Sequence, residues 1–214
     1  MKLNHVDREL MYEAFLKTRQ TLAHVERDFV EWHGGIAHYG FWAVVVADPD
    51  WLAVFAAARA HVARFVHPGY RRAPHVTVAA CGLLAESHVS AAQTARQTAV
   101  LAKAKLAPFP LHAGPLDSFT SAPMITIQDP TGELERVRKC ITAVSPEDTP
   151  APYQPHITLG LYRDAFDTAQ VVECLSAFAP APVQPLLVTE LAFCAFETKD
   201  IQGPIQILER VNLR

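Results

Sequence analysis

Apolar residues recur at helical spacing in the first part of the chain. They form one stripe with a single polar interruption, at Met11, Phe15, Thr18, Leu22, Val25, Phe29 and Trp32. Asp7 can cap the start of such a helix, and Gly34-Gly35 can end it. This pattern predicts a long amphipathic helix over residues 7–32 that docks on the protein's own core. A dimer contact through the same stripe is the alternative.

Shorter apolar runs and helical stretches alternate through the rest of the chain. Asp48-Pro49, for example, supplies an N-cap and a first-turn proline directly after a buried strand. The pattern predicts helices at 49–66, 88–106, 131–144 and 166–178. It predicts strands at 41–47, 74–81, 109–112, 116–120, 124–128, 156–162, 186–196 and 204–212.

This element order predicts an α+β fold with two pseudo-symmetric lobes, each an antiparallel sheet with packed helices, in addition to the N-terminal helix. We expect residues 1–38 to form a helical extension and residues 39–214 to form the bilobal domain. The seam should fall near residues 108–130. We also expect the lobes to exchange elements, so that neither half need fold alone.

Two of the predicted strands carry nearly the same five residues. Pro-His-Val-Thr-Val at 74–78 returns as Pro-His-Ile-Thr-Leu at 155–159. Because a strand alternates its side chains between faces, His75 and Thr77 share one face, as do His156 and Thr158. The alternative is two buried strands that each hold a hydrogen-bonded His and Thr. The repetition favours one shared site, since polar residues at equivalent places in apolar strands are costly unless used.

Two imidazoles and two hydroxyls suit the cleavage of a phosphoester. Hydrolysis of a ribose 2′,3′-cyclic phosphate needs a base for water and an acid for the departing oxygen, and histidine, with a pKa of ~6.5, can be either near neutral pH. Thr77 and Thr158 can donate hydrogen bonds to the nonbridging oxygens. The sequence has no His-Glu-x-x-His and no cluster of Asp and Glu, so we expect no metal and no cofactor.

Charge and composition limit the kinds of partner that the protein is expected to bind. The net charge is −3, which argues against a general nucleic-acid coat protein but allows an enzyme that grips one RNA end or a small nucleotide. The four cysteines are isolated from one another, which indicates reduced thiols. The N-terminus lacks the apolar core of a signal peptide, and no apolar run is long enough to span a bilayer. We therefore expect a cytoplasmic protein without a membrane partner.

The segments at 75–82 and 153–160 resemble the two signature segments of the two-histidine (2H) phosphoesterases. The likeness is closer to the bacterial RNA 2′,5′-ligase-like and 2′,3′-cyclic phosphodiesterase branch, and it extends over residues 40–212 in element order. This resemblance implies a bilobal fold with one His-x-Thr/Ser strand per lobe lining a central cleft. It also implies action on cyclic phosphates or 2′,5′ linkages at RNA ends or in small nucleotides. That branch often has a basic residue shortly after the second Thr, where this chain has Leu161.

The leading hypothesis is a metal-independent cyclic phosphodiesterase in which the four motif residues are catalytic. Arg71 and Arg72 directly precede the first motif and can pair with phosphate, although solvated loop arginines are the alternative. Tyr153 can stack on a base, although packing at the base of its loop is equally consistent with its position. Phe119 is expected in the core.

Three other functions remain open from the sequence. The same site could run an RNA 2′,5′-ligase-type transesterification, or the fold could bind nucleotides or RNA ends without catalysis. The retention of two titrating imidazoles argues against a simple binder. A scaffold assembled through the N-terminal helix is the third. The expected partner is a nucleotide or RNA terminus with a cyclic phosphate rather than DNA, and we expect a monomer rather than a dimer.

Overall fold

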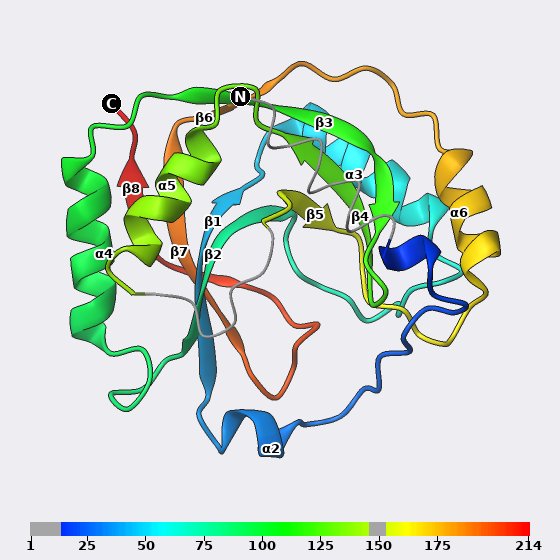
Figure 1. The fold of residues 1–214 in the computed structure, drawn as a ribbon, viewed down its shortest axis with the longest axis horizontal. Coiled ribbons are helices and arrows are strands. Elements are labelled where there is room, and N and C mark those ends of the chain that lie inside the picture. The colour runs from blue at the N-terminus through cyan, green and yellow to red at the C-terminus, as the bar shows by residue number, and fades with distance from the viewer. Residues whose placement is uncertain (1–13, 146–152) are drawn as a thin grey trace.

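Two four-stranded antiparallel sheets lie side by side, with helices on the outside (Figure 1). The computed structural model describes residues 14–145 and 153–214. The first sheet has the strand order β2-β1-β7-β8, formed by β1 (His38–Val45), β2 (His75–Leu83), β7 (Glu190–Glu197) and β8 (Gln206–Asn212). The second has the order β5-β4-β3-β6, formed by β3 (Phe109–Ser118), β4 (Pro123–Gln128), β5 (His156–Thr158) and β6 (Leu186–Val188). The predicted α+β class with two antiparallel sheets is confirmed.

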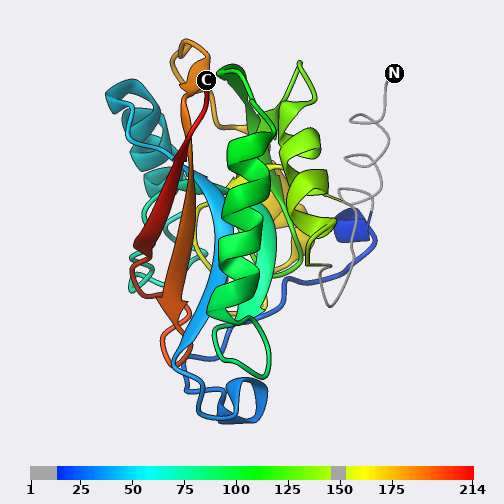
Figure 2. The same ribbon diagram turned by 90° about the vertical axis from the view of Figure 1, so that its left-hand side faces the viewer.

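One pair of helices accompanies each sheet. The helices α4 (Ala91–Lys103) and α5 (Glu133–Thr142) cover the first sheet, and α4 lies across it in Figure 2. Trp42 Nε1 donates to Gln97 Oε1 of α4 at 3.0 Å, and Arg138 of α5 donates to the carbonyl of Val78 at 3.1 Å. The helices α3 (Pro49–His61) and α6 (Thr168–Ser176) lie beside the second sheet, and His61 Nε2 at the end of α3 is 2.7 Å from the carbonyl oxygen of Cys174 in α6.

The helix starts follow the local signals in the sequence. Asp48 caps α3 by accepting hydrogen bonds from the backbone of Asp50 and Trp51. Ser90 and Gln93 form a reciprocal capping box at the start of α4. Because each cap satisfies backbone donors that the first helical turn leaves without partners, the two helices begin within three residues of the predicted positions.

The observed strands depart from the prediction most clearly in three places. The strands predicted at 109–112 and 116–120 are one strand, β3, with an irregularity between Ala113 and Leu116. A Cβ at Gly114 would lie 2.3 Å from Thr126 Oγ1, so only glycine fits this crossing. The strand predicted at 156–162 ends at Thr158, because Gly160 turns the chain away with a φ of 155°. The strand predicted at 186–196 is divided into β6 and β7.

The predicted helix over residues 7–32 is wrong over most of its described length. Residues 7–13 lie outside the described part of the chain; beyond them, only residues 14–16 and α2 (Val30–His33) are helical. Residues 18–29, here called the N-terminal strap, run extended across loops of the second lobe. Its amides bond to carbonyls far along the chain, from Thr21 to Phe166 at 2.9 Å and from His24 to Tyr162 at 2.8 Å.

The strap's apolar side chains do not form a buried stripe either. Leu22 is 63% exposed and Val25 is 60% exposed, whereas Phe15 is buried. Tertiary partners satisfy the backbone donors that a helix would otherwise use, so helical periodicity does not decide the conformation here.

The C-terminal strands connect the two halves of the chain. β7 and β8 join β1 and β2 in the first sheet, while β6 joins the second. The predicted division at residues 38 and 39 stays a prediction. Over residues 14–145 and 153–214, no helix combines the length and apolarity needed to cross a bilayer.

Candidate active site

The two repeated segments meet where the sheets adjoin. β2 is an edge strand of the first sheet and β5 is an edge strand of the second. These two edges approach each other, with Cα atoms within 8 Å (Figure 1). His156 is also close enough to His75 to influence its pKa electrostatically. The fold thus brings together four residues from distant parts of the sequence: His75, Thr77, His156 and Thr158.

Cross-strand register shows which face carries the first pair. His75 lies opposite Val45, and Thr77 lies opposite Ala43. Directly paired residues of an antiparallel ladder point to the same side. That side is opposite to the one on which Trp42 contacts α4. The first motif therefore lies on the face of the sheet turned away from α4.

Each of the two histidines makes an equivalent hydrogen bond to the backbone. His75 Nδ1 lies 2.7 Å from the carbonyl of Ala73, and His156 Nδ1 lies 2.7 Å from the carbonyl of Gln154. A carbonyl only accepts, so Nδ1 donates in each case and a neutral ring carries its lone pair on Nε2. The two lobes therefore present equivalent Nε2 atoms.

A phenylalanine ring packs against each imidazole. The ring centroids of Phe41 and His75 are 5.2 Å apart. Those of Phe119 and His156 are 4.8 Å apart, with the rings edge to face. Phe119 was expected in the core, but it is half-buried and borders the second histidine. These apolar neighbours remove water from the imidazoles and so penalise a charge on either ring.

The pKa values of both histidines are lowered. Burial lowers the pKa of His75 to about 4, with smaller contributions from the charges of Arg72 and His156, while the hydrogen bond to the Ala73 carbonyl partly opposes the shift. Burial also lowers the pKa of His156, against the hydrogen bond to Gln154. In this environment both imidazoles are neutral at pH 7.

Two tyrosines connect each motif to the segment that precedes the other. The Tyr70 side chain, before the first motif, is hydrogen-bonded to that of Thr158. The Tyr153 hydroxyl, before the second, donates to the carbonyl of Thr77 at 3.0 Å. Arg138 lies 4.7 Å from the centre of the Tyr153 ring. Tyr153 is thus bound to the first motif strand, and its stacking on a base stays a prediction.

The two predicted phosphate-binding arginines occupy different environments. Arg71 is 63% exposed and pairs with Asp200 at 2.5 Å. Arg72 is turned inward, with its guanidinium carbon 3.8 Å from the centre of the Phe196 ring. Within the described residues its buried Nε has no hydrogen-bond partner. Of the two cations, Arg72 is the one beside His75, and the role of Arg71 stays a prediction.

Comparison with known proteins identifies the family. Residues 47–200 match the model of the 2'-5' RNA ligase superfamily. The chain belongs to this superfamily. Its two-histidine motifs lie inside the matched region, and the resemblance to the 2H phosphoesterases is confirmed.

Solved structures similar to this superfamily member show the same fold. Escherichia coli LigT complexed with NADP+ has a TM-score of 0.54 and 18% identity, covering 83% of this chain and 98% of LigT. Its apo form has a TM-score of 0.54 and 17% identity, covering 84% and 99%. The protein TT0787 of Thermus thermophilus has a TM-score of 0.50 and 18% identity, covering 82% and 98%. No curated protein matches the chain.

Sequence reasoning missed several neighbours of the superfamily motifs. Phe41 and Phe119 border the imidazoles, and Tyr70 contacts Thr158. A faint signal existed for Tyr70, because each motif has a tyrosine shortly before its histidine. Among the described residues, no three His, Cys, Asp or Glu side chains are grouped so as to hold a metal.

Proposed function

We propose that the protein is a cyclic phosphodiesterase that hydrolyses ribose 2′,3′-cyclic phosphates at RNA ends or in small nucleotides, without a metal. The main support is that His75 and His156, on adjacent edge strands, make equivalent hydrogen bonds through Nδ1. Each neutral ring therefore has its lone pair on Nε2. Superfamily membership supports phosphoester chemistry. E. coli LigT has been crystallised with 3'-AMP, ATP and phosphate, which supports a nucleotide ligand for a relative with this fold.

One histidine acts as base and the other as acid. The Arg72 guanidinium disfavours a proton on His75, so His75 takes the proton from water through Nε2. The water oxygen bonds to phosphorus, and the bond between phosphorus and one ribose oxygen breaks. His156, protonated because the anionic phosphate raises its pKa, gives its Nε2 proton to that oxygen. The product is a phosphomonoester beside a free ribose hydroxyl.

The other site residues stabilise the phosphate. Thr77 and Thr158 donate hydrogen bonds to the nonbridging oxygens, which gain charge in the transition state. Arg72 adds positive charge from the side of the first lobe. Because its Nε has no partner within the described residues, this donor remains for a phosphate oxygen.

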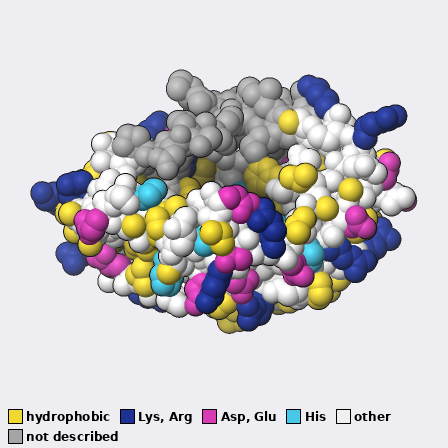
Figure 3. Space-filling view, turned by 90° about the horizontal axis from the view of Figure 1, so that it is seen from below, with side chains coloured by type: hydrophobic (Ala, Val, Ile, Leu, Met, Phe, Trp, Pro, Cys, Tyr) yellow, Lys and Arg dark blue, Asp and Glu magenta, His cyan; other side chains and the backbone are white. Residues whose placement is uncertain are grey.

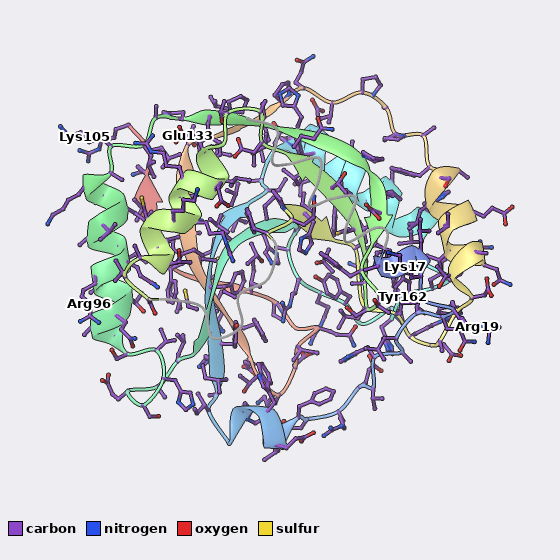
Figure 4. The ribbon with its side chains drawn as sticks, viewed as in Figure 1. Lys17, Arg19, Arg96, Lys105, Glu133 and Tyr162 are labelled. Carbon is purple, nitrogen blue, oxygen red and sulfur yellow. The ribbon has the colours of Figure 1, made fainter. Side chains whose placement is uncertain are left out.

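The distribution of surface charge is consistent with a ligand that the protein binds only at its terminus. Figure 3 shows Lys and Arg side chains interspersed with Asp and Glu on the visible face, without a broad basic area. Arg19, Arg96 and Lys105 lie at the periphery of the view in Figure 4, far from the centre where β2 and β5 meet. A protein that coats long nucleic acid gathers such cations along one surface.

Turnover of a 2′,3′-cyclic nucleotide in the presence of EDTA tests the proposal. The wild-type protein should convert it to a nucleoside phosphate, and His75→Ala and His156→Ala should each slow turnover by ~10²–10⁴-fold while remaining folded. His112→Ala, at an exposed histidine of the second sheet, is the matched control and should keep the wild-type rate. Unchanged rates in either motif variant would refute the mechanism.

A substrate with a p-nitrophenolate leaving group separates the two roles. Such a group departs without a proton, so it does not require the acid. His156→Ala should then recover most of its lost rate, whereas His75→Ala should stay slow. The opposite pattern would reverse the assignment.

Superfamily membership also raises ligase-type transesterification in the same site. A 5′-hydroxyl RNA would then replace water as the nucleophile. Supplying both RNA ends and measuring 2′,5′-linked product against hydrolysed end determines which reaction predominates.

A further inference from the structure

A continuous row of aromatic rings leads from the first catalytic histidine to the surface. Phe41 packs against His75 at 5.2 Å and against Phe196 at 6.2 Å. Tyr39 stacks on Phe196 at 5.4 Å with 29° between the rings. Trp32 continues the series at 5.7 Å from Tyr39, with 34° between the rings. We call Phe41, Phe196, Tyr39 and Trp32 the aromatic row.

The row is covered near the catalytic histidine and open at its far end. Phe41 and Phe196 are buried, Tyr39 is half-buried and Trp32 is 43% exposed. Packing within the core explains the two phenylalanines but not an exposed tryptophan at the end of the series. An exposed indole beside a second ring offers a surface on which a flat ligand can stack.

A half-buried arginine lies along the same row. The Arg72 guanidinium is stacked on Phe196, between His75 and the open end. Its Nε has no partner within residues 14–145 and 153–214. The phosphodiester next to the reacting phosphate would accept a hydrogen bond from Arg72 Nε, and the base beyond it would reach the rings of Tyr39 and Trp32.

We propose that the aromatic row binds the nucleotide that precedes a terminal cyclic phosphate, so that the preferred substrate is a single-stranded oligoribonucleotide end rather than a mononucleotide. This inference rests on the proposed function. The base of the preceding nucleotide stacks on Trp32 and Tyr39, and its phosphodiester meets Arg72. Both aromatic residues lie before residue 47, where the superfamily match begins, so family membership does not assign them this role.

Tryptophan fluorescence tests the inference directly. Trp42 and Trp51 are buried, so quenching by a ligand base reports on Trp32. We expect an adenosine trinucleotide ending in a 3′-phosphate to quench the emission and to bind about tenfold or more tightly than 3′-AMP. Equal affinity for the two ligands, with no quenching, would overturn the inference.

Three variants make the test specific. Trp32→Ala should remove the preference for the trinucleotide, while Trp32→Phe should keep it when affinity is measured by calorimetry. Val30→Ala, at an exposed aliphatic residue of the same helix, should keep both the preference and the quenching. A full preference in Trp32→Ala would contradict the role of the row.

Kinetics distinguish this inference from the proposed function. The ratio of kcat/KM for a cyclic-phosphate trinucleotide to that for the cyclic mononucleotide should fall about tenfold in Trp32→Ala and stay constant in Val30→Ala. If both substrates turn over at equal kcat/KM in the wild-type protein, only the inference fails. If neither turns over, the proposed function fails, and the binding titration still decides the inference.

Discussion

The protonation of each motif histidine depends on one hydrogen bond of its ring and on the burial of that ring. The hydrogen bond from Nδ1 to a carbonyl two residues earlier holds one proton there, and burial disfavours a second proton on Nε2. An imidazole held in this way stays a base until an anion comes near. Because the two histidines make equivalent hydrogen bonds, the charges of neighbouring residues determine which imidazole acts as the base and which as the acid. Arg72 is the neighbouring cation that lowers the pKa of His75.

The lowered pKa of His75 predicts a loss of stability in mild acid. The unfolded chain has the ordinary pKa of ~6.5, whereas the folded value is about 4. Between these values the unfolded state binds the proton first, so the stabilisation is present above pH 6.5 and is lost as the pH falls toward 4. Urea unfolding should show that His75 contributes a loss of about 2 kcal/mol between pH 7 and pH 5.

A variant that does not titrate checks this prediction. His75→Gln should reduce the pH dependence of the unfolding free energy by that amount. His112→Gln, at an exposed position, should keep the wild-type dependence. A His75→Gln curve that parallels the wild type from pH 7 to pH 5 would contradict the lowered pKa.

At the scale of elements, local signals predicted the helices and failed for the strap. The caps at Asp48 and Ser90 act within one turn, so they can be identified from neighbouring residues alone. The strap's hydrogen bonds go to Phe166 and Tyr162, which no periodicity in residues 18–29 can indicate. The short length of β5 likewise depends on Gly160, whose Cβ position lies 2.9 Å from Val66.

Thr21 anchors the strap. It is buried, its hydroxyl donates to the carbonyl of Asp164 at 3.0 Å, and the amide of Phe166 donates to that hydroxyl at 2.9 Å. Thr21→Ala should lower the free energy of unfolding by about 1–3 kcal/mol, because the carbonyl of Asp164 and the amide of Phe166 both lose their part-buried hydrogen bond to the hydroxyl. Chemical denaturation measures the change.

Two neighbouring substitutions serve as controls for Thr21. Thr21→Ser keeps the hydroxyl and should recover most of the loss. Leu22→Ala removes an exposed side chain and should change stability by less than about 0.5 kcal/mol. A Thr21→Ala variant as stable as the wild type would show that the strap is not anchored in this way.

At the scale of the whole molecule, the sequence repeat predicted the motif residues, and the tertiary fold supplied their neighbours. The sequence alone shows two equivalent segments in apolar strands. Phe41 reaches His75 through the pairing of β1 with β2, and Tyr70 reaches Thr158 across the two lobes. Such neighbours depend on which distant strands adjoin, and no local pattern encodes that.

The charge distribution of the molecule predicts a shallow salt dependence. With a net charge of −3 and one inward-facing arginine at the site, few counterions are released on binding. The logarithm of kcat/KM for an oligoribonucleotide should fall with the logarithm of salt concentration with a slope of about −1. Steady-state rates from roughly 50 to 500 mM KCl would measure it, and a slope steeper than about −4 would instead indicate a broad phosphate-binding surface.

The position of β1 in the first sheet has a practical consequence. The match to the superfamily model covers residues 47–200, whereas β1 ends at Val45 and β8 begins at Gln206. Since β1 separates β2 from β7, a recombinant protein trimmed to those limits would leave the strand that bears His75 without a backbone partner in its own sheet. A fragment that keeps the first sheet intact therefore has to extend beyond residues 47–200 at both ends.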